Sequence, residues 1–321
     1  VTRDNVGYIC LTSFMDKSAD EVRAAVEELK KNPAVKSLVL DLRGNGGGIL
    51  ESAVEIVGMF VPKGTEVLRT RGRDKSTEKI YKTTKKPIWE DIPLAVLIDG
   101  GSASASEITA GALQDLDRAV LIGSRSFGKG LVQEPINFTD GSGIRLTVAR
   151  FYTPSGRCIQ KPYEKKGTEY MYDLLDRYNH GELVSADSMK VDTTAVYYTV
   201  KGRKVYGGGG IIPDVFVPMD TTRATNFFIK CNKKATSMRF ASAMFDKYKS
   251  RLMQIEDFDE LEQYLESISI EEQFVDYAAK VDKIKPAAGE WEESREYMMP
   301  QVNGLVGRYS KLGEEAFYRF Y

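Results

Sequence analysis

The chain has 321 residues, of which 42% are hydrophobic, and its 45 basic and 46 acidic side chains leave a net charge of −1. This length is enough to bury a sizeable core and to hold two domains. The balanced charge excludes the basic surface typical of nucleic-acid binding, and the longest apolar runs are the length of strands. We therefore expect neither a nucleic-acid partner nor a membrane span in this chain.

The first residues lack the basic start, the apolar stretch and the small-residue cleavage site of a signal peptide. The first expected strand begins almost at once, at Val6, which indicates that upstream sequence is missing. Strands at Val6–Ser13 and Ser37–Leu42 enclose an amphipathic helix over Asp16–Lys31, and a second helix follows the glycines of Arg43–Gly48. This alternation predicts an α/β fold with a mainly parallel, helix-covered sheet.

The glycine-rich stretch after the second strand allows two interpretations. Counted from Gly44, it resembles a dinucleotide-binding fingerprint, but Ile49 stands where that pattern requires glycine or alanine. A glycine-rich helix entrance also exposes backbone N–H groups, which can hold a phosphate or a developing oxyanion. A purely structural role, in which the glycines only allow a tight turn with positive φ, is compatible with both interpretations.

The centre of the chain carries a serine and a lysine in a strand–helix–strand unit. Two strands are expected at Leu94–Ile98 and Ala119–Ile122, with an alanine-rich helix between them. Ser104 lies where this helix begins, and Lys129 follows the second strand between two glycines. A hydroxyl at a helix N-terminus and an amine in a tight loop are the parts of a Ser–Lys nucleophile pair.

Two other interpretations compete with this one. Ser104 and Glu107 also form a capping box, in which Ser104 only satisfies a helix N–H group. Residues 123–129 match a phosphate-binding P-loop up to its lysine, but Gly130 replaces the required serine or threonine. Because the following residues have no helical period, we reject this nucleotide-binding hypothesis, which would require magnesium-dependent ATP binding.

The cysteines and the single histidine limit the kinds of metal and catalytic site that we expect in this chain. Cys10, Cys158 and Cys231 are scattered and odd in number, which predicts buried thiols and neither a disulfide framework nor a zinc site. His180 lies in a polar stretch, where we expect an exposed loop. A covalent catalyst in this chain would therefore use a lysine as its base.

The rest of the chain predicts more strands, an insertion and a helical end. Strands are expected at Gly64–Arg71, Tyr81–Lys86 and Ile144–Tyr152, the last of them half-buried. The charged, tyrosine-rich residues 161–194 indicate a surface insertion, and the β signal returns at Ala195–Val205. From about Thr221 the chain is expected to be helical, with the clearest segments at Met238–Leu252, Phe258–Ile268 and Ser294–Tyr318.

Several motifs in order resemble those of the carboxyl-terminal processing (tail-specific) proteases. These motifs are Gly7-Tyr-Ile9, Asp41–Gly48, Gly101–Ile108, Phe127–Gly130 and Thr153–Arg157, and they cover roughly the first two-thirds of the chain. The resemblance implies a crotonase-like fold shared with the Clp proteases, and a serine endopeptidase without metal or other cofactor. Its domains would be a protease core at 1–160 plus 195–220, the surface insertion at 161–194 and a helical extension at 221–321.

The resemblance also implies the site residues. Ser104 would be the nucleophile and Lys129 its general base, assisted by Gln133, while the backbone N–H groups of Gly48 and Ala105 would form the oxyanion hole. Lysine is protonated at neutral pH unless burial lowers its pKa, so the base is expected in a desolvated place. Gln133 lies an even number of residues from Lys129 in an extended segment and is expected on the same face.

The resemblance implies partners and a location as well. Substrates would be proteins or peptides with unstructured C-terminal tails, and the location would be the cell envelope, periplasmic in a Gram-negative bacterium. Family members usually carry a PDZ-type domain upstream, which is missing from this chain. The helical extension could form a homo-oligomer contact. The alternative function is a catalytically silent peptide-binding module with the same fold.

Overall fold

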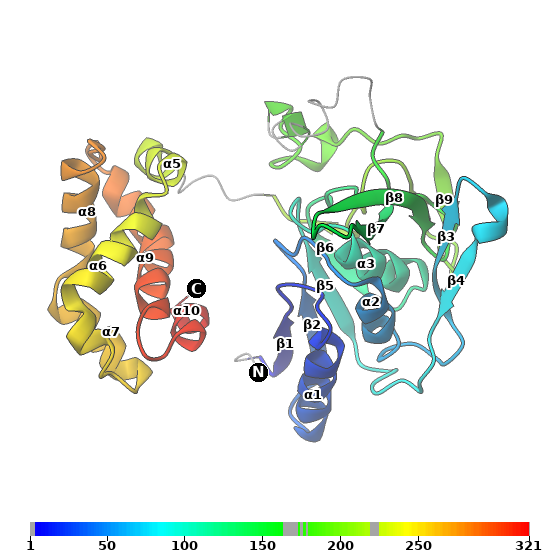
Figure 1. Cartoon of the computed structure of the whole chain (residues 1–321), viewed down its shortest axis with the longest axis horizontal. Coiled ribbons are helices and arrows are strands. Elements are labelled where there is room, and N and C mark those ends of the chain that lie inside the picture. Colours follow the sequence, from blue (N-terminus) through cyan, green and yellow to red (C-terminus); the bar gives the residue numbers. More distant parts are fainter. Residues whose placement is uncertain (1–3, 163–172, 174–175, 178, 219–224, 321) are drawn as a thin grey trace. The chain divides into compact units, whose positions relative to one another are not determined.

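A computed structural model of the chain describes residues 4–162, 173, 176–177, 179–218 and 225–320. The chain forms two compact units, Val1–Met219 and Asp220–Tyr321 (Figure 1). The first unit contains the three sheets of the described residues and all the predicted site residues. The second unit is helical.

A parallel sheet forms the centre of the first unit. In the described part of the chain its order is β1-β2-β5-β6-β11, and all neighbouring strands are parallel. The inner strands bury most of their aliphatic side chains because helices cover the sheet. The strands span Val6–Cys10 (β1), Ser37–Asp41 (β2), Leu94–Ile98 (β5), Val120–Gly123 (β6) and Val215–Phe216 (β11).

The helices of this unit lie beside the parallel sheet (Figure 1). They are α1 (Ser18–Lys31), α2 (Leu50–Val57) and α3 (Ala105–Asp115). Every residue of α3 is buried, because its alanines and Gly111 leave room for close neighbours. A Cβ at Gly111 would lie 2.9 Å from Thr153 Cγ2. The predicted α/β architecture with alternating strands and helices is confirmed.

A second, antiparallel sheet has the order β4-β3-β8-β7. Its strands are β3 (Glu66–Gly72), β4 (Lys79–Lys82), β7 (Leu131–Asn137) and β8 (Gly143–Tyr152), and η1 (Lys75–Thr77) lies between β3 and β4. Sequence analysis placed no named strand at β7, which contains Pro135. The proline is tolerated because β7 is an edge strand, where a backbone N–H is not needed on the outer side.

The prediction that Ile144–Tyr152 is half-buried is wrong for most of this strand. Ile144, Leu146 and Val148 are 37–50% exposed, and the burial begins only near Phe151. Alternation correctly indicates that apolar side chains share a face. It does not tell whether another layer covers that face, and the outer part of the β7–β8 hairpin is uncovered among the described residues.

Several of the described residues in the range 161–194 are buried. Arg177, Glu182 and Leu183 are each less than 9% exposed, and Lys161 is also buried. After η2 (Ala186–Ser188), a short hairpin follows, formed by β9 (Val196–Tyr198) and β10 (Lys204–Tyr206).

The expectation of buried cysteines holds only for Cys231. Cys10 is exposed on the edge strand β1, and Cys158 is partly buried; all three thiols are free. Composition could not place Cys10, because its exposure follows from the face of β1 on which it lies: Tyr8 and Cys10 are exposed, whereas Ile9 between them is buried. His180 is exposed, as predicted.

The second unit has its own apolar core, in which Phe227, Phe240, Phe274 and Trp291 pack edge to face or tilted. The expected helix Ser294–Tyr318 is in fact interrupted after Arg308, before Gly313 at φ 59°. None of the helices in the described ranges is long and apolar enough to cross a bilayer. The helices are α5 (Asn226–Lys233), α6 (Thr236–Leu252), α7 (Phe258–Ser267), α8 (Ile270–Lys280), α9 (Glu290–Arg308) and α10 (Glu314–Phe320).

Candidate active site

Ser104 lies in a constrained turn between β5 and α3. The Asp99 carboxylate closes this turn by accepting hydrogen bonds from the backbone N–H groups of Gly44, Gly101 and Ser102 over 2.9–3.1 Å. Ser104 itself has φ 56° and ψ −112°. An ordinary helix N-cap has extended dihedral angles, so capping alone does not account for this conformation. Strained non-glycine residues of this kind concentrate at functional sites.

The buried side chain of Asn45 ties the glycine-rich turn to the serine turn. Its Nδ2 donates to the Leu11 carbonyl over 2.6 Å, and its Oδ1 accepts from Gly47 N–H over 2.9 Å. The Asn45 carbonyl accepts from Ala103 N–H at 3.0 Å and from Ser106 Oγ at 2.8 Å. Ser106 therefore has a scaffold role, and the two turns form one rigid structure.

The glycines of this turn come very close to Ser104 and to the start of α3. A Cβ at Gly47 would lie 2.8 Å from both Ser104 Cβ and the Ala105 nitrogen. Gly48 has φ 148°, and a Cβ there would lie 2.0 Å from the Phe14 carbonyl oxygen. Among the described residues, neither Gly48 N–H nor Ala105 N–H donates to a protein acceptor. The structure thus brings the two predicted oxyanion-hole segments together.

A charged cluster precedes the glycine-rich turn. The Asp41 carboxylate accepts hydrogen bonds from Tyr8 Oη at 2.5 Å and from the Arg43 guanidinium at 2.6 Å. Burial, with Asp41 close by, raises the pKa of Tyr8 to about 12. Burial acts against the charged form of Asp41, but the hydrogen bonds from Arg43 and Tyr8 outweigh it and lower its pKa. The cluster holds the end of β2 where the turn begins.

The Glu107 carboxylate connects the serine turn (residues 99–104, between β5 and α3) to the loop that contains Lys129 (residues 124–130, here the lysine loop). Glu107 is fully buried. Its Oε1 accepts from Ser126 Oγ at 2.5 Å and Gly128 N–H at 2.7 Å, and its Oε2 accepts from Lys129 N–H at 2.8 Å and Ser104 N–H at 2.9 Å. Burial raises the pKa of Glu107, and these donors oppose that effect. Because they fill the acceptor positions of an ionised carboxylate, the geometry fits the charged form.

In the sequence, Glu107 is recognisable only as the partner of Ser104 in a capping box. The structure contains that arrangement, since Glu107 bonds to the Ser104 backbone, but the same carboxylate also holds the lysine loop. A usable signal existed. Glu107 lies in an alanine-rich helix between two buried strands, where small side chains allow close packing on all sides, and a buried carboxylate needs several donors.

Lys129 follows β6 in an irregular loop, and its side chain is partly buried. Within the described ranges its amine makes neither a hydrogen bond nor an ion pair, and no hydrogen bond joins it to Ser104 Oγ. The structure therefore brings the two backbones together through Glu107, without a direct bond between the two functional atoms. Catalytic hydrogen bonds are often long before substrate binds. No helix follows residues 123–129, as the rejection of the P-loop required.

Gln133 lies on β7 and is exposed. Its Nε2 donates to Thr147 Oγ1 on β8 over 3.3 Å. A register shift between Val132 and Gln133 interrupts the regular alternation of side chains. The argument that placed Gln133 and Lys129 on one face therefore fails, and the role of Gln133 stays a prediction.

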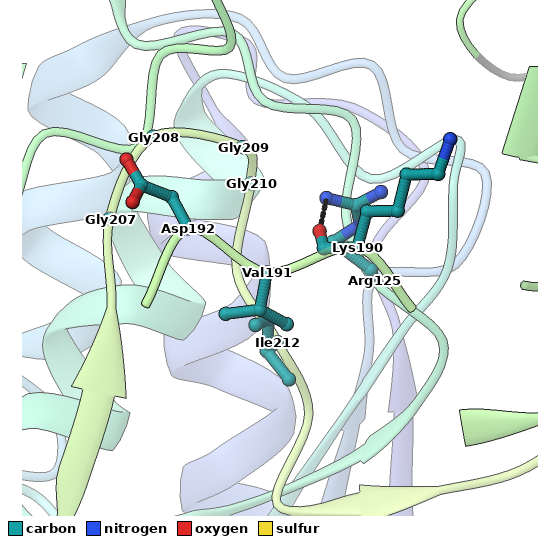
Figure 2. A pocket seen from close by; sticks show the side chains of 9 residues that line it. All are labelled: Arg125, Lys190, Val191, Asp192, Gly207, Gly208, Gly209, Gly210 and Ile212. Atoms are coloured by element: carbon teal, nitrogen blue, oxygen red, sulfur yellow. Dashed lines mark hydrogen bonds between the residues drawn. The ribbon is translucent and has the colours of Figure 1, made fainter. Parts of the chain in front are cut away.

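A shallow pocket lies behind the lysine loop, and neither Ser104 nor Lys129 lines it. Figure 2 shows Arg125 of the loop directed at the carbonyl of Lys190, to which its Nη1 donates over 3.2 Å. The glycines 207–210 form the facing wall. The pocket therefore lies where the lysine loop meets segments that come later in the chain.

Comparisons with known proteins are consistent with this geometry. The sequence model described as peptidase family S41 matches residues 5–169. A carboxy-terminal-processing protease of Bartonella bacilliformis is 44% identical over 159 residues, which are 49% of this chain and 36% of the relative. The carboxy-terminal processing protease CtpB of Bacillus subtilis is 38% identical over 191 residues, 59% of this chain and 38% of the relative. The chain therefore spans little more than a third of these relatives.

Among solved structures, a photosystem II D1 C-terminal processing protease is similar to this chain, with 30% identity and a TM-score of 0.48. The match covers 68% of this chain and 43% of that protein.

Proposed function

The chain belongs to peptidase family S41, and we propose that it is a serine endopeptidase that cleaves proteins near their C-terminal tails. One observation carries the proposal: a single buried carboxylate, that of Glu107, holds the backbone N–H groups of both Ser104 and Lys129. A structural helix cap needs the first of these bonds but not the second.

In the proposed reaction, Ser104 Oγ attacks the carbonyl carbon of the scissile peptide bond while the neutral amine of Lys129 takes the hydroxyl proton. The carbonyl oxygen becomes an oxyanion, which accepts hydrogen bonds from the N–H groups of Gly48 and Ala105. The C–N bond then breaks, Lys129 gives its proton to the leaving amine, and an acyl-enzyme on Ser104 remains. Lys129 next takes a proton from water, whose oxygen attacks the ester carbonyl carbon. The C–Oγ bond then breaks, Lys129 returns the proton to Ser104 Oγ, and the new carboxylic acid end of the substrate leaves.

Three structural features support these roles. The positive φ of Ser104 is that of a strained turn, which exposes a nucleophile at a strand–helix junction. The N–H groups of Gly48 and Ala105 have no protein acceptor among the described residues, and α3 directs the positive end of its dipole toward them. No carboxylate of the described residues pairs with the Lys129 amine, so the amine is not committed to another group.

The finer parts of the proposal follow from the family and remain predictions. Gln133 would assist Lys129. The substrates would carry unstructured C-terminal tails, the protein would act in the cell envelope, and the helical unit would provide a homo-oligomer contact. The alternative, a silent peptide-binding module, would bind such tails without cleaving them.

A cleavage assay tests the proposal. An unfolded protein with an apolar C-terminal tail is incubated with the chain and with its Ser104→Ala and Lys129→Ala variants. We expect cleavage by the parent alone, unaffected by chelators. Equal cleavage by all three would contradict the site assignment. Binding of the tail without cleavage, unchanged in Ser104→Ala, would favour the silent module.

A further inference from the structure

Arg177, in the part of the chain expected to be a surface insertion, reaches into the lysine loop. Its side chain is buried, with 4% of the residue exposed. Nη1 donates to the carbonyl of Ser126 over 2.7 Å and lies 3.4 Å from that of Arg125, and Nη2 donates to the carbonyl of Phe127 over 3.3 Å. One guanidinium thus contacts consecutive carbonyls just before Lys129.

The other backbone groups of this loop are also held. Each N–H from Ser126 to Gly130 donates within the protein, with Glu107 accepting the bonds of Gly128 and Lys129. The Gly128 carbonyl accepts from Lys161 N–H over 3.0 Å. The lysine loop is therefore held by two buried side chains. The Glu107 carboxylate accepts hydrogen bonds from the N–H groups of Gly128 and Lys129, and the Arg177 guanidinium donates to carbonyls of the residues before them.

Further contacts hold the guanidinium in place. Asp173 pairs with Arg177 at 3.0 Å and with Lys161 at 3.1 Å, and the Lys161 ammonium lies 3.9 Å from the centre of the Phe127 ring. Glu182 pairs with Arg125 of the loop at 2.5 Å. Contacts with residues 161–190 thus reach both the backbone and the side chains of the loop.

Burying an arginine is unfavourable unless its donors are used, and desolvation lowers the pKa of Arg177. A buried leucine or methionine would fill the same space at no such cost if only packing were needed. The planar guanidinium carries its N–H groups on separate nitrogens in a fixed fork and can reach carbonyls of successive residues, whereas a lysine ammonium donates from a single nitrogen on a flexible stem. Its chemistry thus matches a need to fix the path of the backbone.

We propose that Arg177 is a positioning residue for catalysis: together with Glu107 it fixes the loop from which the Lys129 side chain projects. Arg177, with Asp173 and Glu182 beside it, then supports the proposed active site and is not part of a surface addition. This inference rests on the proposed Ser104–Lys129 mechanism. It predicts that loss of the guanidinium lowers turnover while substrate binding is retained.

The test compares Arg177→Ala and Arg177→Lys with a matched variant, Arg157→Lys. Arg157 is also fully buried, but it pairs with Asp115 at the far end of α3, 2.8 Å away, and not with the loop. Steady-state cleavage gives kcat and KM, and amide hydrogen exchange of residues 124–130 reports loop order. Thermal melting shows whether each variant is folded.

For Arg177→Ala we expect kcat to fall about 100-fold, the effect of a small misplacement of a catalytic group, with KM changed less than about threefold. Exchange should accelerate in residues 126–130 but not in α3. Added ethylguanidinium should partly restore kcat in Arg177→Ala. The Arg177→Lys variant should have less than half of the parent kcat. Arg157→Lys should melt earlier yet keep the parent kcat.

Parent kcat and parent exchange in folded Arg177→Ala would overturn the inference. So would a kcat loss shared equally by Arg157→Lys, because a general loss of stability would then explain it. A parent chain without Ser104-dependent cleavage would instead contradict the proposed function, and the exchange data would still decide whether Arg177 holds the loop.

Discussion

The Glu107→Gln substitution changes the group that joins the serine turn to the lysine loop and keeps its size. An amide has one acceptor oxygen, whereas each carboxylate oxygen of Glu107 accepts two hydrogen bonds. In the better orientation the new NH₂ replaces Oε1 and donates to Ser126 Oγ, which already accepts from Ile211 N–H, so the Ser126 hydroxyl loses its acceptor. The Gly128 N–H then faces another donor and is left without a partner.

The structure sets the size of the effect. An unsatisfied buried N–H costs about 1–3 kcal/mol, and the bonds from Ser104 and Lys129 each weaken by about 1 kcal/mol when their acceptor becomes neutral. Removing a buried charge offsets part of this loss. We expect the free energy of unfolding to fall by about 2–4 kcal/mol, which is a decrease in melting temperature of about 5–15 °C for a unit of this length.

Calorimetry and the cleavage assay together test this reasoning. Alongside the lower melting temperature, we expect kcat/KM to fall about 100-fold, because the loop that carries Lys129 loses its anchor. Glu51→Gln, an exposed glutamate in the first turn of α2, is the control and should leave both quantities unchanged. Glu107→Gln with the parent's melting temperature and activity would refute the view that this carboxylate organises the site.

Two further predictions concern the glycine-rich turn. In Gly48→Ala the new methyl group would lie 2.0 Å from the Phe14 carbonyl oxygen, at a backbone φ of 148°. We therefore expect either no folded protein or a free energy of unfolding lower by at least about 3 kcal/mol, measured by urea unfolding. Gly44→Ala has open space around its Cβ and should cost less. The lowered pKa of Asp41 means that its charged form stabilises the folded state above about pH 4, the range of an unfolded aspartate, and that this contribution disappears as pH falls through the folded pKa. Asp41→Asn should therefore be less stable than the parent by about 1–3 kcal/mol at pH 7, and the difference should shrink on acidification below pH 4; a difference independent of pH would contradict the assignment.

Local sequence patterns were sufficient to predict most elements of the first unit. The apolar runs of β2 and β5 and the amphipathic pattern of α1 are set by residues close together in the chain. Exposure is not local: Ile144 and Leu146 alternate as in a half-buried strand, yet no layer of the described residues covers them. The same limit applies to Cys10, whose exposure depends on which face of β1 it lies on.

The features of the site also divide into those that a short stretch of sequence predicts and those that depend on contacts between distant residues. The motifs around Ser104 and Lys129 could be recognised because each is a short, ordered pattern. The contacts that Glu107 and Arg177 make with the lysine loop join residues 19 to 52 positions apart in the sequence, and no local pattern encodes them. The bulge before Gln133 depends on pairing with β8, so the alternation rule could not anticipate it.

The most direct test of the central claim is covalent labelling of the serine nucleophile. The chain is treated with a fluorophosphonate, and the modified residue is located by peptide mass spectrometry. The account predicts a single adduct on Ser104, absent in Ser104→Ala and formed at least about 100-fold more slowly in folded Lys129→Ala. An adduct on another serine, or labelling of Ser104 that does not depend on Lys129, would contradict it.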